Sequence, residues 1–153
     1  MRFDARRAQL GIELPRVPVP VANFVPWRQE NGLVFLAGQV CEWNGEVLYV
    51  GKLGVEHGLA NGQAAARICG LNLIAALRSA LGSLDRVRGC VRLGGFVNCD
   101  PQFREVPQVI NGASDLMHEI FGAHGAHART AVGVASLPRG ATVEVDAIFA
   151  VHP

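Results

Sequence analysis

Charged residues are scarce in this sequence. Asp, Glu, Lys and Arg make up 18% of its 153 residues, and the formal net charge is only +1. A chain so close to neutral exerts little long-range attraction on nucleic acid or on an anionic membrane surface. The sequence also lacks a run of about 20 apolar residues, the length that crosses a bilayer. We therefore expect neither nucleic acid nor a membrane as a partner.

Motifs that mark metal, nucleotide and disulfide sites are also missing. No H-E-x-x-H spacing occurs among His118, His124 and His127, and no G-x-G-x-x-G or P-loop run could hold a nucleotide phosphate. We therefore expect neither a metal nor a cofactor. No C-x-x-C pair occurs either, so we expect free thiols buried in a protein of the reducing cytoplasm at four positions: Cys41, Cys69, Cys90 and Cys99.

Apolar residues, by contrast, are plentiful. Half of the chain is hydrophobic and the mean hydropathy is +0.24, which is ample for one folded core. Residues 1–22 predict a short helix over residues 3–10 and then an extended proline-rich segment, because proline lacks an N–H donor and fixes φ. Residues 1–11 lack the apolar stretch of a signal peptide, which agrees with a cytoplasmic location. Residues 23–153 are predicted to form the domain itself.

The order of the predicted elements indicates an α+β fold. Strands are expected over residues 33–40, 46–50 and 87–99, and apolar spacing predicts helices over 57–81 and 101–122. Residues 127–150 predict a closing β-hairpin with a break at Leu-Pro-Arg-Gly. This order suits a single mixed sheet with two long helices on one face. No segment is left to cover the other face, so we infer an oligomer.

Two charged residues interrupt the predicted hairpin. Arg129 is either a solvated side chain at the mouth of a strand or a clamp for a carboxylate, which the fork of a guanidinium matches in a bidentate way. Small neighbours at Ala131 and Gly133 leave room for such a ligand. Glu144 either belongs to a wet strand face or takes part in proton transfer.

Several stretches together resemble one family. These are "LVFLAGQV" (33–40), "INGASDLMHEIFG" (110–122) and above all "ARTAVGVASLPRGATVEVDAIFAV" (128–151). On these motifs the chain is identified as a divergent member of the RidA (YjgF) family of enamine/imine deaminases. The resemblance covers the chain from about Asn23 to its end.

The resemblance implies a fold and a set of site residues. The fold is chorismate-mutase-like, and three copies form a homotrimer around a central β-barrel, with ligand sites in clefts between subunits. Arg129 and Glu144 take the catalytic positions. The implied substrate-binding residues are Phe24, Ala37, Gly38, Asn111, Ser114 and Ala131. The family's helix asparagine matches Asn111 best, with Ser114 as the rival position.

The implied activity is hydrolytic deamination without a cofactor. Arg129 would pair with the carboxylate of a 2-imino acid, and a water near Glu144 would attack the imine carbon, so that ammonia and a 2-keto acid leave. Such a reaction removes damaging metabolites. Phe24 and Ala37 stand where the family has a tyrosine and a serine, so two hydroxyls are lost. The alternative is a trimeric protein that binds a small carboxylate without turnover.

The predicted hairpin raises a geometric question about this pair. In a regular register, odd-numbered Arg129 and even-numbered Glu144 would point to opposite faces of the sheet. A bulge at Gly133 or Gly140 would be needed to turn both to one face.

Overall fold

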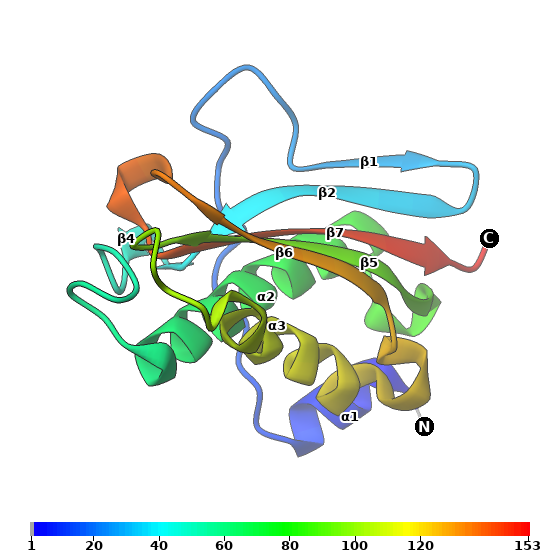
Figure 1. The fold of residues 1–153 in the computed structure, drawn as a ribbon. Helices are drawn as coiled ribbons and strands as arrows, with labels where there is room; N and C mark the ends of the chain where they lie inside the picture. The colour runs from blue at the N-terminus through cyan, green and yellow to red at the C-terminus, as the bar shows by residue number, and fades with distance from the viewer. Residues whose placement is uncertain (1) are drawn as a thin grey trace.

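One five-stranded sheet with helices on a single face forms the molecule (Figure 1). The computed structural model describes residues 2–153, so Met1, the first residue of the predicted N-terminal segment, lies outside it. The strand order is β1-β2-β7-β5-β6. The strands are β1 (Trp27–Glu30), β2 (Leu33–Val40), β5 (Val87–Asn98), β6 (Ala128–Val134) and β7 (Val143–Val151). The predicted α+β class is confirmed.

Shorter elements and three helices complete the chain. Strands β3 (Glu42–Trp43) and β4 (Glu46–Val47) pair in a separate small ribbon. The helices are α1 (Phe3–Gln9), α2 (Leu59–Leu81) and α3 (Val106–Phe121), and the 3₁₀ turns are η1 (Leu84–Arg86), η2 (Gly122–Gly125) and η3 (Pro138–Gly140). The predicted second long helix therefore begins later than expected, because residues 101–105 form a turn and loop before it.

Helices α2 and α3 pack side by side beneath the sheet (Figure 1). Helix α2 ends where Gly82 adopts a left-handed φ of 79°, which a glycine tolerates without strain. By length and composition α2 could cross a membrane, but 67% of its most apolar window is buried inside the protein. Its apolar residues are therefore accounted for by its position between the sheet and α3.

The inner face of the sheet supplies the other half of the core. On β7 the odd-numbered residues Val143, Val145 and Phe149 are fully buried, whereas even-numbered positions are only partly covered, as the alternation predicts. Gly95 of β5 lies directly under α3, because a Cβ there would come 2.5 Å from Ile110.

The predicted closing hairpin is wrong. Strand β6 pairs with β5 in parallel, and β7 lies between β2 and β5, antiparallel to both. Helix α3 connects β5 to β6, and a strand–helix–strand crossover returns the second strand parallel to the first. The alternating residues of β6 and β7 define which face each side chain occupies, but they do not identify the neighbouring strand.

The outer face of the sheet is bare in the single chain. On strand β2, Val34, Leu36 and Gln39 are buried on the helix side, whereas Phe35 on the outer side is 41% exposed. Val132 of β6 is exposed to the same extent on this outer face. Phe35 and Val132 are thus apolar side chains that a single chain leaves uncovered on the outer face of the sheet.

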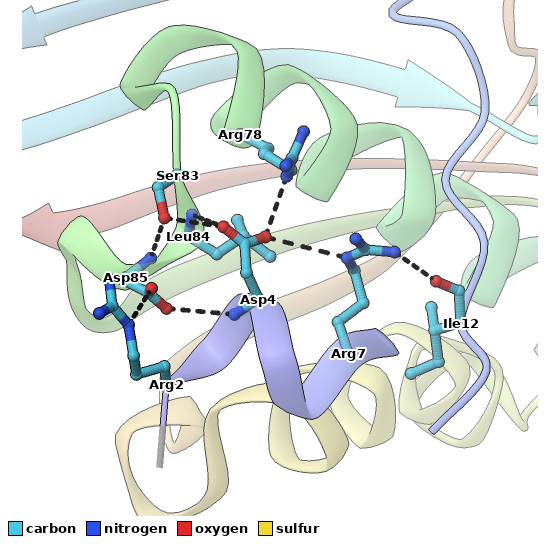
Figure 2. Close-up of polar contacts among 8 residues, drawn as sticks. All are labelled: Arg2, Asp4, Arg7, Ile12, Arg78, Ser83, Leu84 and Asp85. Atoms are coloured by element: carbon cyan, nitrogen blue, oxygen red, sulfur yellow. Dashed lines mark hydrogen bonds and ion pairs between the residues drawn. The ribbon is translucent and has the colours of Figure 1, made fainter. Parts of the chain in front are cut away.

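The N-terminal helix is tied to the domain through Asp4 (Figure 2). The Asp4 carboxylate accepts hydrogen bonds from Ser83 Oγ at 2.7 Å, Leu84 N at 3.0 Å and Arg78 Nε at 2.9 Å. Burial opposes the charged form, but these hydrogen bonds outweigh it and lower the pKa of Asp4. The extended segment that follows runs from α1, past the helices, to a loop above β1 (Figure 1).

We expect Asp4→Ala to lower the free energy of unfolding by about 1–3 kcal/mol, because three donors lose a charged acceptor. The lowered pKa means that this stabilisation is present above the unfolded value of 3.8 and is lost as the pH falls through the folded value. Urea unfolding at pH 7 and at pH 3 measures both effects. Glu13→Ala, at an exposed acid of the same segment, is the control. Equal losses for the two variants would contradict the anchoring role.

Candidate functional site

Arg129 lies on the edge strand β6, and its side chain is held by α3. Its Nη1 donates to Asn111 Oδ1 at 2.7 Å and to Ser114 Oγ at 3.1 Å, and its Nη2 donates to the Pro107 carbonyl at 3.1 Å. Asn111 and Ser114 are three positions apart on the helix and so share one face. Asn111 and Ser114, the two rival matches for the family's helix asparagine, therefore both contact Arg129.

The anchored guanidinium retains donors for a ligand. Of its five N–H groups, three are used by the contacts to α3. The Nε–H and one N–H of Nη2 have no acceptor among residues 2–153. These two donors match the spacing of the two oxygens of a carboxylate. Arg129 is half-buried, so this edge is within reach of a small molecule.

His127 also belongs to this cluster, although its place in the sequence suggested only a candidate metal ligand. Its Nδ1 lies 2.7 Å from the Gly125 carbonyl and its Nε2 lies 2.8 Å from Ser114 Oγ. His127 lies two residues before Arg129, and residues two apart on an extended strand point to the same face. This spacing is the feature of the sequence that could have placed His127 beside Arg129. Within the described part of the chain, no three His, Cys, Asp or Glu side chains are grouped to hold a metal.

Glu144, Phe24 and Gly38 form a second group around a cavity of about 260 Å³. The cavity lies between β2, the start of β7 and the proline-rich segment, and Arg139 also lines it. A Cβ at Gly38 would overlap the Glu144 carboxylate, so the glycine lets this side chain keep its present position against β2. Burial, with a smaller contribution from the charge of Asp146, raises the pKa of Glu144.

A bulge in β2 shapes this second group. Leu36 pairs with Ala147 and Gln39 pairs with Val145, so Ala37 and Gly38 together face a single residue of β7. Ala37 itself does not line the cavity. No bulge occurs at the two glycines where one would have been needed, because Gly133 pairs with Val97 in regular register and Gly140 lies in the turn η3.

The two groups lie on opposite faces of the sheet. Arg129 is aligned with Leu93 on the helix-covered face, and Ala131 is aligned with Gly95 on the same face. Glu144 is aligned with Phe96 and lies on the outer face. Because β5 separates β6 from β7, no bulge brings Arg129 and Glu144 together within one chain. A cleft that contains both must be built from two copies.

Comparison with known proteins identifies the family of this chain. The family model described as "YjgF/chorismate mutase-like, putative endoribonuclease" matches residues 4–150. This chain belongs to that family. Among its YjgF-like relatives, Protein TCP17 of Trypanosoma cruzi is 44% identical over 148 residues, which cover 96% of this chain and 92% of that protein.

Two solved structures also resemble the whole chain. The protein Atu1372 of Agrobacterium tumefaciens is 39% identical with a TM-score of 0.90, and the match covers 97% of this chain and 92% of that one. A protein of Shewanella oneidensis is 32% identical with a TM-score of 0.95, covering 99% and 100%. The match to both includes the N-terminal segment, so α1 and the extended segment are part of the shared fold.

We expect the pKa of Glu144, measured by carbon NMR, to lie above its ordinary value of 4.5. A raised carboxyl pKa means that the folded state binds the proton more tightly than the unfolded state. The stability of the wild type relative to Glu144→Gln should therefore fall as the pH rises from 4.5 through the folded value, and then level off. Glu46→Gln, at an exposed glutamate, controls for the lost charge. A pKa at or below 4.5 would contradict the burial of this carboxyl.

Proposed function

We propose that this protein hydrolyses reactive 2-imino acids to 2-keto acids and ammonia in clefts between subunits. The observation that carries the proposal is the anchored Arg129, whose two remaining donors suit a carboxylate. Family membership supports the same class of ligand. The E. coli protein TdcF, which shares the fold at 23% identity and a TM-score of 0.62, has been solved with bound serine, a molecule that also carries a carboxylate.

The proposed reaction uses position and proton transfer. Arg129 holds the substrate carboxylate, so the adjacent imine carbon is fixed in the cleft. Glu144 accepts a proton from a water as that water attacks the carbon, and the C=N electrons move to nitrogen. Nitrogen takes up one proton from solvent as the carbinolamine forms and a second, returned by Glu144, before the C–N bond breaks. The carbinolamine hydroxyl gives its proton to water as its O–H electrons form the C=O bond, so ammonia and the 2-keto acid are released. Burial raises the pKa of the Glu144 carboxyl, which makes its carboxylate a stronger base towards the attacking water.

We further propose that the assembly is a homotrimer with the outer sheet faces turned inward. The exposed apolar side chains Phe35 and Val132 favour coverage of that face by other copies. Such an assembly would also allow Glu144 and Phe24 of one copy to meet Arg129 of the next. The word endoribonuclease in the family description suggests RNA as a ligand, but a net charge of +1 does not favour it.

Replacement of Arg129 tests the activity directly. We expect Arg129→Ala to reduce imine hydrolysis by at least about a hundredfold, because bidentate carboxylate binding is lost. Arg129→Lys should recover only part of the rate, since a lysine cannot present the fork. The measurement is the decay of 2-iminobutanoate trapped with semicarbazide. Equal rates for Arg129→Ala and the wild type would exclude the proposed activity.

Mixed oligomers test whether two copies build each site. Arg129→Ala and Glu144→Gln should each be inactive alone. Co-expressed with two affinity tags and purified as mixed trimers, they should regain about a third of the sites, because each mixed trimer has one junction at which one copy supplies the arginine and its neighbour the glutamate. The separately purified variants, combined without subunit exchange, are the control. Mixed trimers no more active than this control would contradict a site shared between copies.

A second candidate function is the binding of a small carboxylate without turnover. It is favoured by Phe24 and Ala37, which lack the hydroxyls that the resemblance leads us to expect at these positions. Thermal unfolding with a panel of 2-keto acids and other carboxylates distinguishes the two functions. A raised midpoint without any imine hydrolysis supports binding alone, and no shift with any carboxylate argues against both.

A further inference from the structure

A continuous hydrogen-bonded chain leads from the backbone of η2 to the guanidinium of Arg129. The Gly125 carbonyl lies 2.7 Å from His127 Nδ1, His127 Nε2 lies 2.8 Å from Ser114 Oγ, and Ser114 Oγ lies 3.1 Å from Arg129 Nη1. His127 is thus one side chain removed from the proposed carboxylate site.

The chemistry of each partner determines the direction of these hydrogen bonds. A carbonyl oxygen only accepts, so His127 Nδ1 carries a hydrogen, and in the neutral ring Nε2 is then an acceptor. The Ser114 hydroxyl therefore donates to His127, and its lone pairs remain for the N–H of Arg129. Burial, reinforced by the charges of His118 and Arg129, lowers the pKa of His127, which favours this neutral form.

Without His127, the Ser114 hydroxyl would have another acceptor. A serine inside a helix commonly donates to the carbonyl four residues earlier, here that of Ile110 in α3. In that rotamer the oxygen moves towards the helix backbone and away from the side chain of Arg129. The contact to His127 thus opposes the local preference of the helix and keeps the oxygen on the arginine.

We propose that His127 is a positioning residue of the carboxylate site, which orients the Ser114 hydroxyl so that Ser114 and Asn111 together fix Arg129 for its ligand. This inference rests on the proposed function and deepens it. Ser114 is not assigned as a nucleophile, although it contacts a histidine. Ser114 is only 7% exposed, and its oxygen is already engaged by Arg129 and His127.

Two substitutions of His127 separate orientation from packing. His127→Asn keeps a donor for the Gly125 carbonyl but places no acceptor at Ser114, whereas the amide oxygen of His127→Gln reaches the position of Nε2. We expect His127→Asn to weaken the binding of pyruvate, measured by calorimetry, about three- to tenfold. His127→Gln should remain within about twofold of the wild type. His124→Asn, at an exposed histidine of η2, should leave the affinity unchanged.

Ser114→Ala provides a second route to the same answer. It should weaken pyruvate binding as much as His127→Asn does, and the double variant should be no weaker than Ser114→Ala, because His127 acts through Ser114. Wild-type affinity in Ser114→Ala, or equal losses in the Asn and Gln variants of His127, would overturn the inference.

Arg129→Ala distinguishes failure of this inference from failure of the proposed function. If it binds pyruvate normally, the proposed function fails, and if it alone loses binding, only the role of His127 fails.

Discussion

The attachment of Arg129 to α3 is the interaction on which the candidate site depends. An arginine on an edge strand would ordinarily be free to move in solvent, and ordering it for a ligand would cost conformational entropy. Three hydrogen bonds to one helix remove that freedom in advance, and they leave one edge of the guanidinium for a carboxylate. The helix is in turn fixed against the sheet by close contacts such as that of Ile110 on Gly95. The packing of α3 on the sheet thus determines where the positive charge of Arg129 lies.

The topology of the sheet has a further consequence for the site. Because β7 occupies the centre and β6 the edge, Arg129 and Glu144 belong to opposite faces and cannot serve one ligand within a chain. The outer face that carries Glu144 also carries exposed apolar side chains. Assembly would therefore cover that face and complete the site in a single step, which links the stability of the oligomer to its proposed activity.

Much of the fold could be predicted from the sequence, because apolar spacing reports which face of an element is buried. The helices over residues 59–81 and 106–121, and the buried odd-numbered face of β7, follow from that spacing. Strand neighbours do not follow from it, and the hairpin prediction failed for that reason. The pairing of Arg129 with Glu144 came from resemblance, and the opposite faces of the two residues emerge only when the strand order is known. His127 was considered as a metal ligand, because nothing in the sequence places Ser114 beside it.

A crystal structure of the assembled protein with a bound 2-keto acid tests the central claim most directly. The account predicts a carboxylate on the Nε and Nη2 edge of Arg129, with the contacts of Nη1 to Asn111 and Ser114 unchanged and Glu144 of a neighbouring copy close to the 2-carbon. A ligand bound elsewhere, or an Arg129 that leaves α3 to reach it, would contradict the account.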